Sequence, residues 1–294
     1  MDSKSERTEM SHKVALCAGL LFAAAVIAAP AAHADDWSKT YAVNGRADLH
    51  VQTDDGSVSV TSGDQNEIYV HVTTTRYTIG SSGVTIDQSQ NGNSVDVHVR
   101  TPHFHWGFWG SSGSIRVDVR VPRNLDLDVN TGDGDVNTQP VSGNIRIVTG
   151  DGNIDANGLH GQVYLHSGDG RIDSSGMDGT LKVDTGDGHI TIDGRFDSLQ
   201  AQTGDGSIDA SAAAGSKVAD GWALHSGDGR ITLRVPSDLS AELDAHTGDG
   251  SVSVDVPMTV SGTLNGSSVH GRLNAGGGLL RISSGDGSIH IERT

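Results

Sequence analysis

The chain has 294 residues, 40 glycines, six prolines and a formal net charge of −17 at neutral pH. So acidic a chain is a poor candidate for binding nucleic acid or anionic lipid through charge, and a reasonable candidate for binding cations. Glycine is about twice as frequent as in ordinary globular proteins, and hydrophobic residues make up 35% of the chain. The composition is therefore that of a folded protein in which glycine replaces bulkier residues.

Residues 1–34 have the pattern of a secretory signal peptide. The apolar run VALCAGLLFAAAVIAAPAA leads into the small-x-small sequence AHA at 32–34 and then into polar DDWSK, so cleavage is predicted after Ala34. The chain is therefore predicted to be exported to the periplasm, the cell envelope or the extracellular space, with no transmembrane anchor after cleavage. Its single cysteine, Cys17, lies in this leader, so the exported chain is expected to have no disulfide bond.

Residues 35–121 alternate between apolar and polar positions without a longer fixed period. Stretches such as ADLHVQTDDGSVSV and NEIYVHV predict β-strands with one buried face. The turn-forming sequences DDGS, GDQN and NGNS predict antiparallel hairpins. We expect this region to cap the open edge of the fold that follows it.

One segment of this region, PHFHWGFWG at 102–110, is rich in aromatic residues. It contains Phe104, Trp106, Phe108 and Trp109, and its glycines favour a hairpin tip or a loop. Clustered aromatics either fold back to plug the end of a core or form an exposed patch that recognises a glycan, a protein partner or a membrane interface. These four residues are therefore candidate binding residues.

Residues 122–294 contain eight copies of the sequence Thr/Ser-Gly-Asp-Gly. The first glycines of the copies are Gly132, Gly150, Gly168, Gly186, Gly204, Gly227, Gly248 and Gly285. The first five copies are spaced by 18 residues, and the later intervals are 23, 21 and 37 residues. A fixed period predicts a repeat architecture in which each unit stacks on the next. The last interval is close to two periods, which indicates a coil near NGSSVHGRLNAGGG that lacks the motif.

Apolar residues alternate with polar ones on both sides of each motif, as at Leu181 and Val183 before it and Ile190 and Ile192 after it. A period of two predicts two short strands per unit, and a second glycine-rich corner such as NGLHG closes the coil. The predicted fold is therefore all-β: a β-solenoid (a β-helix or β-roll) with about 18 residues per rung, preceded by the antiparallel capping region. The same alternation places the Thr or Ser of each motif inside, where its hydroxyl would bond neighbouring rungs.

The motif aspartates then form a single file along the solenoid. They are Asp133, Asp151, Asp169, Asp187, Asp205, Asp228, Asp249 and Asp286. A structural role explains them, since aspartate suits tight turns and accepts backbone N–H bonds, and Arg171 and Arg230 would add counter-charge. The alternative is a file of Ca²⁺ sites, as in the calcium-binding rolls. However, one carboxylate per rung supplies few of the oxygens that Ca²⁺ requires, and the aspartate here lies between the glycines instead of after them.

The order of these elements resembles that of a known family. The segments LHVQTDDGSVSV and SIRVDVRVP, the serial TGDG units and the closing LLRISSGDGSIHIER are together similar to the bacterial putative-adhesin family of glycine-rich β-solenoid proteins, a family built on a domain of unknown function. The resemblance covers essentially the whole chain after the signal peptide. It implies a secreted or envelope-located β-solenoid and supplies no catalytic residues.

Three functions are compatible with these features. The first is a non-enzymatic scaffold for adhesion to a cell-surface, glycan or envelope partner, since identical rungs suit extended contact. The second is a polysaccharide-active enzyme on a β-helix, which would need a local cluster of acids with perturbed pKa values instead of evenly repeated ones. The third is a secreted roll that Ca²⁺ stabilises. No catalytic residue is predicted, no cofactor other than Ca²⁺, and no nucleic-acid partner.

Overall fold

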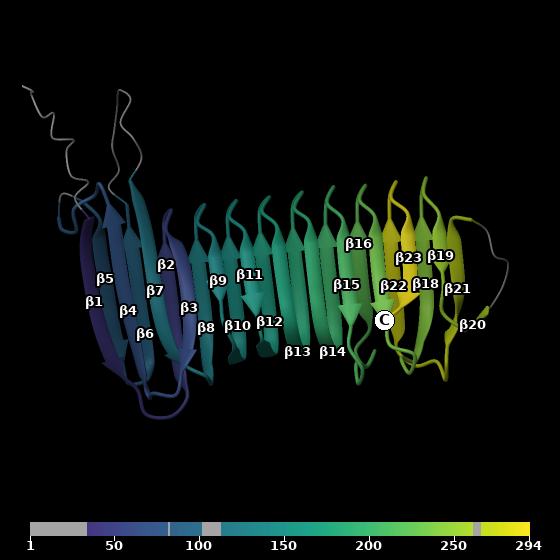
Figure 1. The fold of residues 1–294 in the computed structure, drawn as a ribbon, viewed down its shortest axis with the longest axis horizontal. Helices are drawn as coiled ribbons and strands as arrows, with labels where there is room; N and C mark the ends of the chain where they lie inside the picture. Colours follow the sequence, from purple (N-terminus) through teal and green to yellow (C-terminus); the bar gives the residue numbers. More distant parts are fainter. Residues whose placement is uncertain (1–33, 82, 102–112, 261–265) are drawn as a thin grey trace, which may run out of the picture. The chain divides into compact units, whose positions relative to one another are not determined.

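The computed structural model describes residues 34–81, 83–101, 113–260 and 266–294. These residues form 23 β-strands and no helix, which confirms the prediction of an all-β chain. Ala32–Thr294 form one compact unit, in which the strands lie side by side in series (Figure 1). The signal peptide at 1–34 and the division of the remainder into 35–121 and 122–294 stay predictions.

The middle of this unit is a series of coils whose strands pair in parallel with those of the next coil. Its strands are β8 (Leu125–Thr131), β9 (Val136–Thr138), β10 (Val141–Thr149), β11 (Ile154–Asn157), β12 (Leu159–Ser167), β13 (Ile172–Thr185), β14 (Ile190–Thr203) and β15 (Ile208–Ala212). Along the stack the paired residues are Leu127, Ile145, Val163, Leu181 and Leu199, each 18 residues after the one before. The motif thus recurs in the sequence because its coils are stacked in register.

Alternating side chains of each strand point into the coils and form one hydrophobic core. In β12, Val163 and Leu165 are at most 3% exposed, whereas the intervening Tyr164 faces outward. Phe196 and Trp222 are also fully buried and meet edge to face, with 6.0 Å between their ring centroids. Burying one such large apolar side chain contributes roughly 1.5–3 kcal/mol, so the aligned core files hold the coils together.

The last coil of the chain lies between two earlier ones. The C-terminal strands are β16 (Trp222–Ser226), β17 (Ile231–Val235), β18 (Ala241–Thr247), β19 (Val252–Val254), β20 (Met258–Val260), β21 (Ser268–Leu273), β22 (Leu279–Ser284) and β23 (Ile289–Arg293). β22 pairs in parallel with both β16 and β18, and β23 pairs in parallel with both β17 and β19. β21 pairs antiparallel with β18 and β20. The prediction of a further coil near NGSSVHGRLNAGGG is therefore wrong, because β21 in that segment pairs antiparallel along one edge of β18.

The N-terminal strands combine antiparallel and parallel pairing. They are β1 (Ala34–Ala42), β2 (Ala47–Thr53), β3 (Ser57–Gly63), β4 (Glu67–Thr75), β5 (Thr85–Asn91), β6 (Ser94–Arg100) and β7 (Ser114–Pro122). β5 and β6 form the expected hairpin at NGNS, and β4 pairs antiparallel with β1 and β7. β2, however, pairs in parallel with β6 and β8, and β3 with β7 and β9. The prediction of hairpins at DDGS and GDQN is therefore wrong. β2 and β3 do not pair with each other but form one coil of the parallel stack.

Candidate functional site

Each motif forms a corner between two strands, and its Thr or Ser lies inside the coil. The buried Thr149 hydroxyl donates to the carbonyl of Gly134 in the preceding corner at 2.9 Å and accepts from the amide of Gly152 in its own corner at 3.2 Å. The same donation to a neighbouring corner is made by Thr131, Ser167, Thr185, Thr203, Ser226, Thr247 and Ser284. The predicted internal hydroxyl ladder is thus confirmed, and it runs from hydroxyl to backbone carbonyl.

Both glycines of the motif are required by the close approach of neighbouring corners. A Cβ on Gly188, the second glycine of its motif, would lie 2.0 Å from the carbonyl oxygen of Gly170. A Cβ on Gly150, a first glycine, would lie 2.5 Å from the carbonyl oxygen of Gly132 and 3.1 Å from a carboxylate oxygen of Asp133. A side chain at either position would collide with the neighbouring backbone. The stacking therefore explains why each aspartate stands between two glycines.

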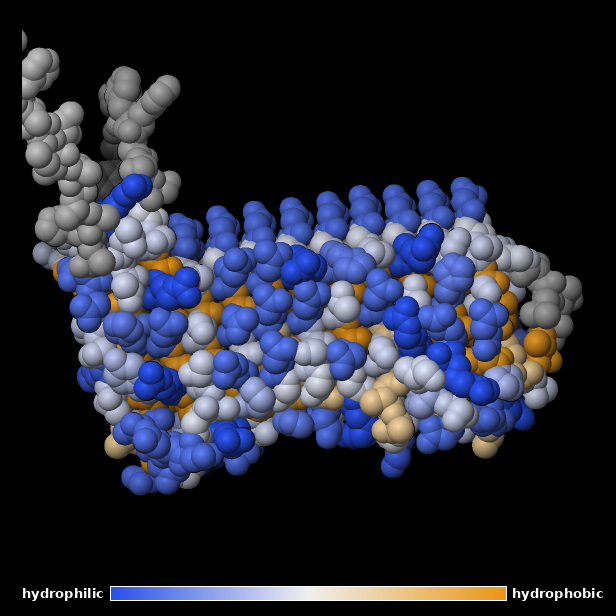
Figure 2. All heavy atoms as spheres, viewed as in Figure 1, coloured by the Kyte–Doolittle hydropathy of each residue, from blue (hydrophilic) through white to orange (hydrophobic). Residues whose placement is uncertain are grey.

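The motif aspartates and Asp55 form an exposed row that we call the aspartate ridge. In the order of the stack its members are Asp55, Asp133, Asp151, Asp169, Asp187, Asp205, Asp228, Asp286 and Asp249. Hydrophilic residues follow one another at regular intervals along the upper edge in Figure 2, where the turns between strands gather in Figure 1. Within the described residues, no hydrogen bond or ion pair engages the side chain of any ridge aspartate. The expected bonds to backbone amides are not formed, and Arg171 pairs with Asp173 instead, at 2.8 Å.

Asp55 is the ridge member that the motif search misses, because its segment lacks the first glycine. The signal that identifies it is the surrounding sequence: TDDGSVSV at 53–60 differs from TGDGSVSV at 247–254 at one position. In the structure Thr53 pairs with Thr131, and a Cβ on Gly132 would lie 3.2 Å from a carboxylate oxygen of Asp55. Asp55 thus holds the same place beside its neighbour as the motif aspartates do.

Replacing Asp151, Asp169 and Asp187 together by asparagine is expected to stabilise the protein. Carboxylates one coil apart, at about 4.8 Å, repel each other by roughly 1 kcal/mol in water, and nothing in the described structure offsets this repulsion. We expect the free energy of unfolding to rise by about 1–3 kcal/mol at low ionic strength and by less in concentrated salt, which screens exposed charges. Thermal unfolding at low and high salt measures the difference.

The matched control makes the same change in net charge outside the ridge. Asp220, Asp238 and Asp255 are exposed and stand apart from the file of corners. Their replacement by asparagine should alter the free energy of unfolding much less. Equal stabilisation by the two triple variants would show that overall charge, and not the ridge, causes the effect.

The ridge does not form a closed metal site. In the part of the chain that the structure describes, no three His, Cys, Asp or Glu side chains gather closely enough to hold a metal ion. Ca²⁺ takes six to eight oxygen ligands, whereas the ridge offers one carboxylate per coil. Binding of Ca²⁺ by the motif aspartates stays a prediction.

The four aromatic candidates, Phe104, Trp106, Phe108 and Trp109, lie outside the described residues. The strands on either side of them are placed: β6 pairs with β2, and β7 pairs with β3. The amide of Thr101, next to the end of β6, donates to the side chain of Asp54 at 2.9 Å. Thr101, the last described residue before these four, therefore lies beside the corner that carries Asp55.

An ion-pair cluster lies on the outer surface of β13 and β14. Arg195 donates to Asp178 through Nε at 2.6 Å and to Asp197 through Nη1 at 2.7 Å and Nη2 at 3.1 Å. The hydrogen bonds from the Arg195 guanidinium lower the pKa of the Asp197 carboxyl below its ordinary value of 3.8. Asp197 also raises the pKa of Arg195. The cluster is a structural contact between neighbouring coils.

Arg195→Met is expected to lower the thermal midpoint by a few degrees at pH 7, and less at acid pH. Because the pKa of Asp197 is lower in the folded state than its unfolded value of 3.8, the stabilisation is present above pH 3.8 and is lost as the pH falls through the folded pKa. Both side chains are a third or more exposed, so the contribution is about 1 kcal/mol at most. Thermal unfolding between pH 7 and pH 3 measures it. Arg116→Met, which removes another exposed arginine, is the control. If the difference in thermal midpoint between Arg195→Met and this control stayed constant from pH 7 to pH 3, the ion pair could not be its cause.

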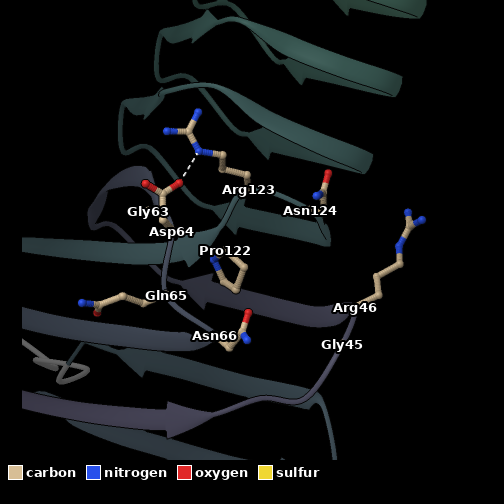
Figure 3. Close-up of a pocket in the computed structure, with 9 residues that line it drawn as sticks. All are labelled: Gly45, Arg46, Gly63, Asp64, Gln65, Asn66, Pro122, Arg123 and Asn124. Carbon is tan, nitrogen blue, oxygen red and sulfur yellow. Dashed lines mark hydrogen bonds and ion pairs between the residues drawn. The ribbon is translucent and has the colours of Figure 1, made fainter.

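A hollow of about 470 Å³ lies at the other end of β8 from the ridge. Segments that link strands line it, at 45–46, 63–66 and 122–124, and Arg46 and Arg123 extend away from each other there (Figure 3). Arg123 donates to Asp64 at 2.8 Å, and Arg46 donates to Asp126 at 2.9 Å. Because both cations already have carboxylate partners, this hollow offers less to a charged ligand than the ridge does.

The sequence profile of the family described as Toastrack DUF4097 matches residues 46–292. No protein with a curated description matches the chain. No helix long and apolar enough to cross a membrane occurs in the part of the chain that the structure describes.

Three solved structures are similar to this chain at low sequence identity. A "putative lipid binding protein" of Parabacteroides distasonis is 13% identical, with a TM-score of 0.49, over 88% of this chain and 97% of that one. A "putative adhesin" of Bacteroides fragilis is 13% identical, with a TM-score of 0.43, over 88% and 97%. A "putative cell adhesion protein" of Clostridium sporogenes is 12% identical, with a TM-score of 0.31, over 89% and 100%. Identities this low assign no ligand to the present chain.

Proposed function

The chain belongs to the Toastrack DUF4097 family, and we propose that it is an exported β-solenoid that serves as a non-enzymatic scaffold for adhesion or interaction. The repeating unit of this solenoid is one coil of about 18 residues. The protein acts in the periplasm, in the cell envelope or outside the cell. The observation that carries this proposal is the aspartate ridge, an exposed file of carboxylates without partners in the described structure.

The ridge supports an interaction role because it repeats one accessible group at even intervals. A partner that brings positive charge, such as an amino-sugar polymer or an anionic glycan coated with Ca²⁺, relieves the repulsion along the whole file at once. Weak contacts at many linked sites combine into much tighter binding than one contact provides. Nucleic acid and anionic lipid without bridging cations are repelled by the same surface.

The polysaccharide-active alternative has less support. Glycoside hydrolysis uses a carboxylic acid whose pKa is raised, so that it can donate a proton at neutral pH. Among the described residues, the carboxyls whose pKa clearly departs from its ordinary value are Asp126 and Asp197, and hydrogen bonds from Arg46 and Arg195 lower both. Both carboxyls are therefore poor proton donors at neutral pH.

A roll stabilised by Ca²⁺ is compatible with the scaffold function. An ion that binds only the folded state raises the midpoint of thermal unfolding. A clear rise with millimolar Ca²⁺, relative to EDTA, would make the ridge an ion ladder and the adhesion dependent on Ca²⁺. An unchanged midpoint would leave the aspartates as corner residues that act directly on a partner.

The scaffold is tested by measuring how much protein is retained on coated surfaces. The surfaces carry chitosan, neutral chitin oligosaccharides, or purified lipopolysaccharide with and without millimolar Ca²⁺. The comparison is with a ridge variant in which Asp151, Asp169, Asp187 and Asp205 are replaced by asparagine. The unaltered protein should be retained on chitosan, or on lipopolysaccharide when Ca²⁺ is present, and the ridge variant should not. Equal retention of both proteins, or no retention of either on any surface, would overturn the proposal.

A further inference from the structure

A groove on the outer face of β2, β8, β10, β12 and β13 forms a second candidate site, which is separate from the ridge. Its volume is about 630 Å³, within the usual range for small-molecule sites. Its lining includes Asp126, Asp128, Arg146, Gln162, Tyr164 and Lys182. A smaller hollow of about 230 Å³, which extends to β6, shares His50, Asp128 and Arg146 with it. No ridge aspartate lines either space.

Tyr164 lies between two cations in this groove. The register of β10, β12 and β13 places Arg146, Tyr164 and Lys182 in one row across the sheet. The guanidinium carbon of Arg146 is 4.8 Å from the centroid of the tyrosine ring, and Nζ of Lys182 is 5.4 Å from it. Cation–π attraction holds both groups against the ring, so the row presents two positive charges at a fixed place.

The two cations are only weakly paired, although three carboxylates, Asp48, Asp126 and Asp128, also line the groove. Among the described residues Lys182 has no ion pair, and the carboxylate that Arg146 reaches, Asp128, is 4.0 Å from its Nε. Arg46, which does not line this groove, is by contrast hydrogen-bonded through two of its nitrogens to Asp126, which does. In a chain whose net charge is −17, a lysine without an ion pair next to a loosely paired arginine leaves strong donors available for an anionic ligand.

The remaining lining suits a ligand with many hydroxyl groups. The side chains of Gln162 and Thr180 face the groove and make no hydrogen bond within the described structure. An amide and a hydroxyl each donate and accept, and a carboxylate such as Asp128 accepts from several hydroxyls at once. Donors and acceptors for neutral hydroxyls thus surround the two cations.

We infer that this groove binds an acidic saccharide, with the sugar carboxylate on Arg146 and Lys182 and the sugar hydroxyls on Gln162, Thr180 and Asp128. A uronate or a sialate carries one negative charge per sugar beside several neutral hydroxyls, which matches the mixed lining. A phosphate dianion concentrates twice that charge close to Asp126 and Asp128, which would repel it. The inference goes beyond the scaffold function and does not depend on the ridge.

Isothermal titration of the purified protein tests the inference. The probes are trigalacturonate, 3′-sialyllactose and neutral maltotriose, all in EDTA so that Ca²⁺ cannot bridge an acidic sugar to the ridge. At least one acidic sugar should bind, and maltotriose should not; the acidic sugar that binds identifies the source of the carboxylate. Lys182→Met should weaken that binding about tenfold or more, because a charge-assisted hydrogen bond is lost. Lys217→Met, which removes an exposed lysine outside the groove, is the matched control and should leave the affinity unchanged.

Three outcomes would overturn the inference. The first is no heat of binding from either acidic sugar at millimolar concentration, and the second is maltotriose binding as tightly as an acidic sugar. The third is an affinity of Lys182→Met equal to that of the unaltered protein. The variant with four asparagines in the ridge should keep its saccharide affinity. Failure of the surface-retention test and failure of this titration are therefore separate results.

Discussion

Gly188→Ala is expected to destabilise the protein by about 3 kcal/mol or more. A Cβ at this position would lie 2.0 Å from the carbonyl oxygen of Gly170 and 2.6 Å from the hydroxyl oxygen of Thr185. Neither atom can move away freely, because the Thr185 hydroxyl donates to that carbonyl at 3.0 Å. The two coils would have to separate at this corner, which strains the parallel pairing of β13 with β14. Thermal unfolding followed by circular dichroism measures the loss.

Gly63→Ala is the matched control for this substitution. Gly63 ends β3, and a Cβ there would meet no other atom within 4 Å, so the same chemical change creates no collision. Its effect should be within about 0.5 kcal/mol, as for most surface substitutions. If Gly188→Ala unfolded at the same temperature as Gly63→Ala, close stacking of the corners could not be the reason for the second glycine of the motif.

Thr149→Val is expected to cost about 2–4 kcal/mol, although the two side chains have almost the same shape. The substitution removes the donor to the Gly134 carbonyl and the acceptor for the Gly152 amide, both inside the coil. A buried polar group left without a partner costs roughly 1–3 kcal/mol, and here two such groups are left. The free energy of unfolding, from denaturant titration, gives the cost.

Two further variants identify the hydroxyl as the cause. Thr149→Ser keeps the hydroxyl and should recover most of the stability, as the natural serine at Ser167 in the next corner indicates. Thr191→Val makes the same change on the outer face of β14, where the side chain is exposed, and should have little effect. A Thr149→Val protein as stable as Thr191→Val would mean that the hydroxyl ladder contributes nothing.

The repeating coil and its corner are predictable from the sequence because the pattern is local. Alternation around each motif determines which side chains are buried, and the same alternation places Thr149 and its counterparts inside the coil. Membership of the family follows from the same segments. The close contact between corners also accounts for the two glycines, although the sequence alone attributes them to turn geometry.

The order of the coils at the two ends is not predictable in this way. Every coil presents nearly the same strand edge, so the repeat itself does not determine which coil pairs with which. The connections decide: β22 enters between β16 and β18, and β2 enters between β6 and β8. Such long-range pairings have no signal in the local pattern.

The environment of the ridge is likewise a property of the fold. From the sequence, Arg171 is a natural counter-ion for the preceding aspartate, because it follows the motif directly. Arg171 directly precedes β13 and its side chain is exposed, so it reaches Asp173, two residues further on. The carboxylates at the corner therefore stay unpaired. The row of Arg146, Tyr164 and Lys182 obeys the same 18-residue period, but its three members are of different types and repeat no motif, so the sequence does not single them out.

The insertion of the last coil has a consequence for how the chain matures. A repeat protein can ordinarily grow by adding one unit to the end of the preceding one. Here the coils of β16 and β18 reach their final positions only when residues 279–293 are available to enter between them. In a chain that is synthesised with its N-terminus first, the stack of coils therefore cannot close until residues 279–293 have emerged. A product truncated before β22 exposes facing strand edges, which are sites of aggregation and of proteolysis. The insertion thus makes closure of the stack depend on residues 279–293.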